Sequence, residues 1–537
     1  MAGIELYDAT LRDGMGGGGM TLTATEKVRV VKALDELGVD LIEAGFPASN
    51  PKELELFGLL ERVSLAHAEV VAFGMTRRRG VDVDEDEGLR VLAGSFVPVV
   101  TLVGKSSAAQ AEIVLKVSRD ENLAMIGESI AHLVARGKRV LFDAEHFFDG
   151  VAADEGYAHA CVRAAADAGA ERVVLCDTNG GSLPLDVHAA VAKLRERMPE
   201  VALGIHSHDD TGCGVANTLV AVQAGASQVQ GTINGIGERT GNANLITILA
   251  DLQLKLGYDV LPPEKLARLT ETAHLLDELL NRAPDPAQPY VGKHAFAHKA
   301  GMHAAGVRQA SEMFEHVDPE KVGNRSDVLI SELSGRASIE EKARAGGVAL
   351  DDELVRRILE RVKELEHAGY QFEAADGSFE LLMRREADAG YEPLFKLESW
   401  RVIVEKHADG HATTEATIKI WVPTATGGER YVRTAEGNGP VNALDRALRE
   451  AIGEIHPHLK DIELVNFKVR ILDETKGTGA VTRVLIDASD GHDVWGSIGV
   501  SENLIAASWD ALVDSLEYGM RGGDRSAPEV LRIDSTR

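Results

Sequence analysis

The first 260 residues alternate short apolar runs with amphipathic stretches. The apolar runs have the length of buried strands, and the stretches between them carry apolar residues at helical spacing. About eight strand–helix units in about 250 residues match an α/β fold of the (β/α)8 TIM-barrel type, with a doubly wound open sheet as the alternative. The expected strands are Ile4–Tyr7, Leu41–Ala44, Val70–Phe73, Phe96–Leu102, Arg139–Phe142, Arg172–Cys176, Ala202–His206 and Gln228–Ile233. The expected helices are Thr25–Leu37, Lys52–Arg62, Glu121–Arg136, Glu155–Ala168, Leu185–Met198, Gly214–Ala224 and Asn244–Leu256.

Polar side chains gather where these strands end. In a barrel the chemistry collects at the C-terminal ends of the strands, so an arbitrary scatter of polar residues would not line up in this way. The polar residues in question are Arg12 and Asp13, Glu43, Thr76 and Arg77, Thr101, Glu145 and His146, Asp177 and Thr178, His206 and His208, and the loop from Asn234 to Asn242.

His206 and His208 form the most informative of these groups. Side chains two residues apart on a strand share one face, and two imidazoles about 6–7 Å apart suit a divalent metal. Such a pair can also serve only as hydrogen-bonding groups at a strand end. Asp13 comes close to both histidines only if the sheet closes into a barrel, and the three would then leave open positions for a substrate. Arg12 could donate from its guanidinium to a substrate oxygen that is bound to the metal, although a lone arginine more often forms a surface ion pair.

The loop Asn234–Asn242 contains three glycines. A dinucleotide-binding fingerprint requires Gly-x-Gly-x-x-Gly, and here the third glycine comes one residue late, in the last unit rather than the first. We therefore favour a tight loop that brings Asn242 towards the metal over a dinucleotide site.

The pattern changes after about residue 260. Pro262 and Pro263 and the stretch Ala283–Pro289 are breakers, and they bracket an expected helix, Glu264–Asn281. From Phe395 onwards two similar halves each read β-β-β-α, which suits a ligand-sensing or dimerisation module, with a simple packing domain as the alternative. We expect a catalytic barrel at 1–260, helical connector subdomains at 261–394, a C-terminal α+β regulatory domain at 395–525 and a tail at 526–537.

The charge and the cysteines limit the partners and the compartment. A net charge of −28 argues against nucleic acid and anionic membrane as partners. The chain has no apolar run of transmembrane length, and Met1–Asp8 lacks the basic start and apolar core of a signal peptide. Cys161, Cys176 and Cys213 have no metal-ligand spacing, so a reducing, cytoplasmic location is expected.

Three motifs together resemble the signatures of the DRE-TIM metallolyase superfamily, in its 2-isopropylmalate synthase and citramalate synthase branch: Asp8–Gly14, Gly204–Asp210 and Asn234–Asn242. Four further stretches are similar to the longer citramalate synthases in particular, namely Asp143–Gly150, Cys176–Gly181, Ser331–Arg336 and Gly437–Leu444. The resemblance covers nearly the whole chain. It implies a Claisen-type condensation of acetyl-CoA with pyruvate in isoleucine biosynthesis, a divalent metal, a homodimer, and a C-terminal allosteric domain with isoleucine as its effector.

At matching positions the resemblance implies that Asp13, His206 and His208 bind the metal and that Asn242 is a further ligand or a neighbour of the ligands. This set of side chains suits Zn, Mn, Mg or Co.

The resemblance also implies the catalytic and substrate-binding residues. Arg12 would polarise the ketone, and Thr178 would hold the carboxylate of the oxo acid. Glu145 would be an acid/base group, and His303 would help to deprotonate the acetyl methyl group.

Two departures from the family pattern keep alternatives open. The run Gly16–Gly19 stands where the family commonly has Gln or Glu, and Phe314 stands where it usually has Tyr. One alternative is a 2-isopropylmalate synthase or related acyltransferase that acts on another 2-oxo acid, or a lyase with the reverse chemistry. The other is a metabolite-binding regulator that has lost catalysis.

Overall fold

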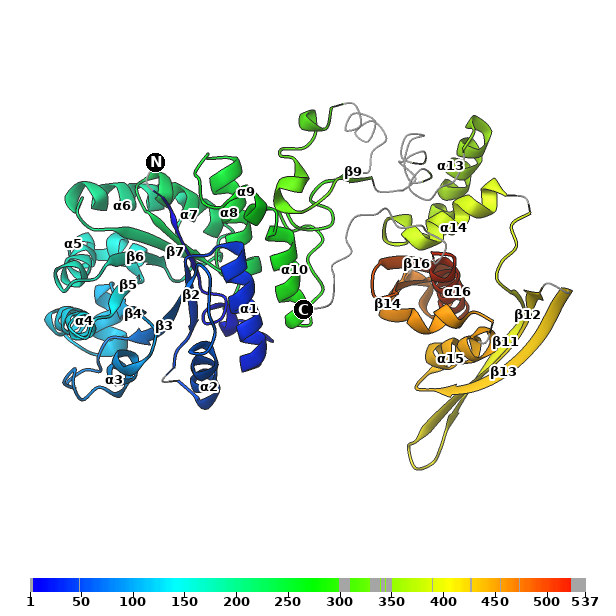
Figure 1. The fold of residues 1–537 in the computed structure, drawn as a ribbon, viewed down its shortest axis with the longest axis horizontal. Helices are drawn as coiled ribbons and strands as arrows, with labels where there is room; N and C mark the ends of the chain where they lie inside the picture. Colours follow the sequence, from blue (N-terminus) through cyan, green and yellow to red (C-terminus); the bar gives the residue numbers. More distant parts are fainter. Residues whose placement is uncertain are drawn as a thin grey trace. The chain divides into compact units, whose positions relative to one another are not determined.

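The computed structural model describes residues 3–47, 49–298, 310–328, 339, 343, 350–388, 390–424, 427–453, 455–472 and 474–522. The chain divides into two compact units (Figure 1). The first unit is Met1–Phe296 with Glu315–Ser326, and the second is Ala297–Phe314 with Asp327–Arg537.

In the first unit eight parallel strands close into a barrel in the order β1 to β8, surrounded by helices (Figure 1). Tyr7 of β1 lies opposite Leu41 of β2 on one side and Gln230 of β8 on the other, so the sheet has no open edge. The predicted TIM barrel is confirmed, and the open sheet is excluded. The strands are β1 (Glu5–Asp8), β2 (Leu41–Gly45), β3 (Glu69–Met75), β4 (Val99–Lys105), β5 (Arg139–Glu145), β6 (Arg172–Asp177), β7 (Leu203–Ser207) and β8 (Gln228–Gly231). The helices are α1 (Ala24–Leu37), α2 (Pro51–Leu60), α3 (Glu87–Gly94), α4 (Arg119–Val134), α5 (Phe147–Asp167), α6 (Pro184–Arg197), α7 (Gly214–Gln223), α8 (Leu245–Leu254), α9 (Pro263–Leu266) and α10 (Leu269–Leu279).

Two helices of the barrel differ from the sequence expectation. The sequence does not predict α3, because it has only eight residues, two of them glycines, and follows an irregular acidic stretch; the Asp86 side chain caps it by accepting from the Leu89 N–H. The prediction of a single helix at Glu264–Asn281 is wrong. It is divided into α9 and α10, because Arg268 leaves the helical region at φ −91° and ψ 1°.

Two further elements have bounds that differ from the expected ones. Helix α5 begins at Phe147 and is interrupted at Asp154, so the expected helix Glu155–Ala168 is only its second part. Strand β4 continues beyond Leu102 to Lys105, where its last residue pairs with Glu145 of β5. Thr101 therefore lies inside the strand rather than at its end.

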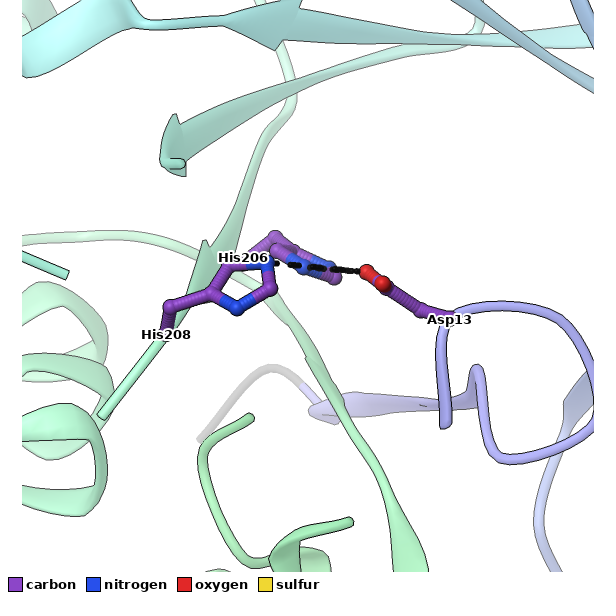
Figure 2. A group of neighbouring side chains, drawn as sticks. All are labelled: Asp13, His206 and His208. Atoms are coloured by element: carbon purple, nitrogen blue, oxygen red, sulfur yellow. Dashed lines mark ion pairs between the residues drawn. The ribbon is translucent and has the colours of Figure 1, made fainter. Parts of the chain in front are cut away.

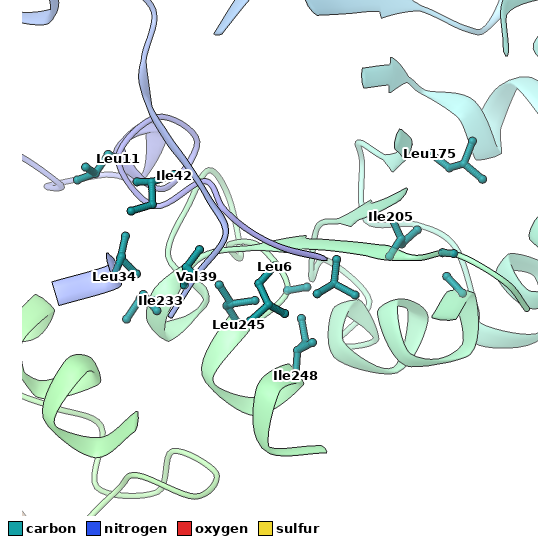
Figure 3. Packing of buried hydrophobic residues seen from close by; sticks show 14 of the residues in the cluster. Leu6, Leu11, Leu34, Val39, Ile42, Leu175, Ile205, Ile233, Leu245 and Ile248 are labelled. Atoms are coloured by element: carbon teal, nitrogen blue, oxygen red, sulfur yellow. The ribbon is translucent and has the colours of Figure 1, made fainter. Parts of the chain in front are cut away.

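Alternate strand residues face opposite sides of the barrel wall. Leu6, Ile42 and Ile205 pack outwards among helix residues such as Leu34 and Ile248 (Figure 3). Burial of one such side chain contributes about 1.5–3 kcal/mol. A separate small cluster contains Tyr7, Leu41, Val71, Val99 and Leu141, which face the barrel interior.

The interior becomes polar towards the C-terminal ends of the strands. Two residues beyond Leu41, Val99 and Leu141, the same face of each strand carries Glu43, Thr101 and Asp143, and all three are buried. The apolar cluster therefore closes the middle of the barrel, and the polar side chains above it line the end at which the sequence places the chemistry.

The second unit contains a βββα repeat. Each half is a three-stranded antiparallel sheet followed by a helix, and the two halves share one apolar core that includes Ile418, Leu444, Val484 and Leu512. The strands and helices are β9 (Ala297–His298), β10 (Asp327–Val328), α13 (Asp352–His367), α14 (Asp376–Ala387), β11 (Lys396–Lys406), β12 (Ala412–Thr424), β13 (Gly427–Gly437), α15 (Pro440–Ile452), β14 (Glu463–Ile471), β15 (Thr482–Ser489), β16 (Val494–Ser501) and α16 (Leu504–Gly522).

The proposed division of the chain into a barrel, a connector and a regulatory domain, with boundaries at residues 260 and 394, stays a prediction. The first compact unit extends to Phe296 and so includes α9 and α10. Within the described residues, none of the helices has the length and apolar character required to cross a bilayer.

Candidate active site

Asp13, His206 and His208 lie together at the C-terminal end of the barrel (Figure 2). One ligand atom from each lies within 4.8 Å of the others, an arrangement that could hold a metal ion. The Asp13 Oδ2 atom lies 3.1 Å from Nε2 of His206 and 3.7 Å from Nε2 of His208. Barrel closure produces this proximity, because β8 pairs with both β1 and β7.

The loop that carries Asp13 is fixed from several sides. The buried carboxylate of Asp8 accepts hydrogen bonds from the Thr10 backbone N–H and hydroxyl, and the Thr10 Oγ1 accepts from the Ile233 N–H. The buried ammonium of Lys27 donates to the Leu11 carbonyl and pairs with Glu53 at 2.5 Å. These contacts place the backbone immediately before Arg12 and Asp13.

The charges around the three side chains favour a cation between them. Burial raises the pKa of Asp13, but Arg12 and the two histidines outweigh it and hold that pKa well below its usual range. Burial lowers the pKa of His206, yet the hydrogen bond and the charge of Asp13 raise it above its ordinary value. Burial, and then the charge of His206, lower the pKa of His208 to about 4. Asp13 is therefore ionised, His208 is neutral, and positive charge is favoured beside Nε2 of His206.

Asn242 lies next to this group. It forms an isolated bridge with His208, and its Nδ2 donates to the Ile236 carbonyl. Among the described residues, its buried Oδ1 has no hydrogen-bond partner, and neither has Nδ1 of His208. A buried amide oxygen without a partner is costly, and coordination of a cation would satisfy it. The donor set therefore fits a divalent metal.

The guanidinium of Arg12 is held in one orientation. Its Nε donates to the Glu43 carboxylate at 2.7 Å, its Nη1 lies 3.3 Å from Asp13, and its Cζ lies 4.0 Å from the ring centre of Phe73. Glu43 is fully buried, and it also accepts from the Tyr7 hydroxyl at 2.8 Å. A planar guanidinium fixed in this way can donate to a substrate oxygen with little further loss of side-chain conformational entropy.

Thr178 follows β6, and its Oγ1 accepts a hydrogen bond from the His146 N–H at 2.8 Å. This contact uses the oxygen as an acceptor and leaves the hydroxyl hydrogen to donate. The Thr178 carbonyl accepts from Arg239, which also binds Asp210 through two hydrogen bonds of 2.9 Å. The loops after β6, β7 and β8 are thereby joined at the rim of the barrel.

Glu145 ends β5 and pairs with Lys105, the last residue of β4, at 2.5 Å. Lys105 is not among the residues predicted for the site, because the fourth strand is predicted to end at Leu102. The missed signal is the continuation of the apolar run through Val103 and Gly104.

A cavity of about 400 Å³ joins these groups. Six residues to which the resemblance gives a catalytic, substrate-binding or metal-binding role line it: Arg12, Asp13, Glu145, Thr178, His206 and His208. Phe46, Phe73, Met75, Val103 and Leu115 supply apolar walls. Arg239, from the loop expected after the eighth strand, adds a polar group, and so do Lys105 and Asp143, which were not predicted for the site. The alternation of Asp143 with Glu145 on one strand could have revealed Asp143. His303 lies outside the described residues, and Phe314 belongs to the second unit.

Close packing explains part of the glycine run after Asp13. A Cβ on Gly17 would lie 2.8 Å from the Gly237 carbonyl oxygen, and a Cβ on Gly16 would lie 2.9 Å from the Glu238 side chain. A larger residue at Gly17 would therefore push this loop away from the loop after β8. A Cβ on Gly18 would meet nothing within 4 Å, so close packing does not explain why this position is a glycine.

Asp143 is buried beneath the cavity, and among the described residues its Oδ1 has no hydrogen-bond partner. Burial, and then the charge of Glu43, raise its pKa from 3.8 to about 7. At pH values between 3.8 and about 7 the folded carboxyl therefore holds a proton that the unfolded carboxyl has lost. The raised pKa of Asp143 lowers the free energy of unfolding. This loss is absent below the pKa of the carboxyl in the unfolded chain, and it grows by about 1.4 kcal/mol per pH unit up to the pKa in the folded protein.

We expect Asp143→Asn to raise the Tm of the chelator-treated protein at pH 8 by at least about 3 °C, and by less at pH 5.5, because an amide does not ionise. Thermal unfolding at the two pH values measures this difference. Asp167→Asn, at an exposed position at the end of α5, is the control. Equal gains in Tm at both pH values would contradict the assignment of a buried, protonated carboxyl.

Comparison with known proteins assigns the chain to a family. Residues 3–276 match the HMGL-like family model, residues 290–369 match the homocitrate synthase post-HMGL domain-like model, and residues 373–520 match the LeuA allosteric (dimerisation) domain model.

Full-length relatives agree with these matches. The (R)-citramalate synthase of Streptomyces coelicolor is 50% identical over 519 residues, which is 96% of each chain. The (R)-citramalate synthase of Aquifex aeolicus is 44% identical over 96% of this chain and 97% of its own length. A probable 2-isopropylmalate synthase of Methanopyrus kandleri is 32% identical over 95% of this chain and 97% of its own length. This chain therefore belongs to the HMGL-like family within the DRE-TIM metallolyase superfamily, and (R)-citramalate synthases are among its full-length relatives.

Proposed function

We propose that this chain is a metal-dependent acyltransferase that condenses acetyl-CoA with pyruvate and water to give (R)-citramalate and CoA. The observation that carries the proposal is the placement of Arg12, Thr178 and the Asp13–His206–His208 group around one cavity of about 400 Å³. Full-length identities of 44–50% to two relatives named (R)-citramalate synthase support pyruvate as the oxo acid.

Asp13, His206 and His208 would hold a divalent cation (Zn, Mn, Mg or Co), with Asn242 as a further ligand or neighbour. When bound, the cation would supply Lewis-acid polarisation of the oxo acid. Arg12 would donate to the ketone oxygen, where negative charge develops, and Thr178 would donate its hydroxyl hydrogen to the carboxylate.

The condensation joins the acetyl methyl carbon to C2 of pyruvate. A base must first remove a proton from that methyl group, and we assign this step to His303, on resemblance alone. As the carbon–carbon bond forms, the C2–O double bond opens, and its oxygen takes up a proton to become the hydroxyl of the product. Water then cleaves the thioester to release CoA. Glu145 would act as an acid/base group, and Lys105 holds its carboxylate at the cavity wall.

The second unit would regulate the reaction and join two copies of the chain. Its match to the LeuA allosteric (dimerisation) domain model supports both roles. Large apolar side chains on its sheets, such as Ile403, Trp421 and Phe467, are 44–47% exposed and suit contact with a second copy. We propose a homodimer with isoleucine as the effector. A cytoplasmic location completes the proposal, in keeping with cysteines that are all free.

The test is to mix the purified protein with a divalent metal, acetyl-CoA and each of several 2-oxo acids and to measure thiol release. Release with pyruvate, reduced by isoleucine, is the expected result. Release with 2-oxoisovalerate but not with pyruvate would instead identify a 2-isopropylmalate synthase. No release with any oxo acid by a protein that binds metal would favour the metabolite-binding regulator.

A further inference from the structure

Two glutamines lie inside the barrel, where such folds normally place branched apolar residues. Gln228 and Gln230 are two residues apart on β8, share its inner face and are both fully buried. Burial of an amide without hydrogen bonds costs roughly 1–3 kcal/mol, so the bonds of these two side chains decide whether the barrel tolerates them.

Their hydrogen bonds form one continuous chain from the N-terminal end of the barrel to His206. The Gln228 Nε2 donates to the Glu5 carboxylate at 2.6 Å, and the Gln230 Nε2 donates to the Gln228 Oε1 at 3.2 Å. The Gln230 Oε1 then lies 3.0 Å from Nδ1 of His206. Four side chains thus connect the beginning of β1 with the candidate metal centre.

Glu5 determines the direction of every bond in this chain. An ionised carboxylate only accepts, so Gln228 must present its NH₂ group to Glu5 and its oxygen to Gln230. Gln230 must then present its own oxygen to His206, and Nδ1 of His206 must donate. The Nε2 atom, which faces Asp13, is left as the nitrogen with a lone pair for a cation.

The surrounding residues hold the chain in place. Arg172 pairs with Glu5 at 3.2 Å and donates to the Ser227 hydroxyl at 2.6 Å, which fixes the position of the carboxylate. Gly204 provides the space for the first amide, because a Cβ there would lie 3.0 Å from the Gln228 Oε1.

We propose that Glu5, Gln228 and Gln230 form a relay of positioning residues that fixes the tautomer and ring orientation of His206 for metal binding. The relay rests on the metal site of the proposed function but assigns a role to side chains that touch neither metal nor substrate. Groups that hold a metal-ligating histidine through its second nitrogen typically change metal affinity by about 10–100-fold when they are removed.

Gln230→Met tests the relay, because methionine fills a similar volume but offers His206 no oxygen acceptor. We expect the Kd for Mn²⁺ and for Zn²⁺, measured by competition with a chromophoric chelator, to rise by about 10–100-fold. The matched control is Gln253→Met on α8, which removes two hydrogen bonds to Leu261 and none of the hydrogen bonds of the relay. Its metal Kd should equal that of the wild type.

Glu5→Gln tests the direction of the relay from its far end. The substitution keeps the size of the side chain but allows either end of the amide to face Gln228, so we expect a smaller rise in Kd of at least about threefold. This variant changes a partly exposed residue at the rim of the barrel, and it decides the question if Gln230→Met does not fold.

The outcomes separate the relay from the metal site. A folded Gln230→Met protein that binds metal as tightly as the wild type, with or without a lower Tm, would overturn the relay and leave the proposed function standing. A Glu5→Gln protein with unchanged metal affinity would overturn the role of Glu5 in setting its direction. A wild-type protein that binds neither Mn²⁺ nor Zn²⁺ would overturn the metal site and the relay together.

Discussion

Replacement of His206 by alanine is expected to abolish metal binding and thiol release together. His206 contributes Nε2 at 3.1 Å from Asp13, and its loss leaves Asp13 and His208 as the remaining pair of the group. Because Lewis-acid polarisation and an oriented substrate contribute several kcal/mol each, we expect turnover to fall by at least about 10³-fold. Metal content and thiol release, measured on the same preparation, check this result.

The control for this prediction is His188→Ala. His188 is exposed on α6, so its replacement should change neither metal content nor turnover. A His206→Ala protein that retained stoichiometric metal and more than about a tenth of the activity would refute the proposed centre, because that loss corresponds to only about 1.4 kcal/mol.

Replacement of Arg12 by lysine is expected to separate catalysis from metal binding. Lysine keeps the positive charge, but it cannot donate to Glu43 through a planar fork and also stack on Phe73. Loss of one positioned donor to a developing oxyanion costs about 10²–10³-fold in kcat. Metal affinity should change by only a few fold, because Arg12 is not one of the proposed ligands.

Arg163→Lys is the matched control. Arg163 lies on the surface of α5 and pairs with Glu200, so the same change of side chain should leave kcat unaltered. If Arg12→Lys retained the kcat of the wild type, the ketone would have to be polarised without this guanidinium. If it lost metal and activity in parallel, Arg12 would act by holding Asp13 and not by contacting the substrate.

Short-range patterns in the sequence were sufficient to predict the barrel. Short apolar runs and capped amphipathic helices are local properties, and eight such units have few ways to bury their apolar faces. Local patterns were insufficient for α3 and β4. Helix α3 has only eight residues, two of them glycines, and its first turn is capped by Asp86. The last residues of β4 are strand because β5 pairs with them as far as Glu145.

For the candidate site, the sequence determined which residue types were available and at which strand ends they lay. His206 and His208 share a strand end, and Asp13 follows the first strand, so closure alone predicted their approach. The structure places their ligand atoms within 4.8 Å of one another. Their assignment as metal ligands stays a prediction, as do the roles of Arg12, Thr178, Glu145, Asn242 and His303.

Only the tertiary structure decided which side chains support these residues. Glu5 and Gln228 are 223 positions apart in the chain, yet they share a hydrogen bond of 2.6 Å because β1 and β8 pair with Glu5 directly opposite Gln228. The ion pair between Lys105 and Glu145 likewise depends on their register in neighbouring strands. The physical reason is that a register shift of one residue reverses the face of every side chain, and the packing of all eight strands together selects the register.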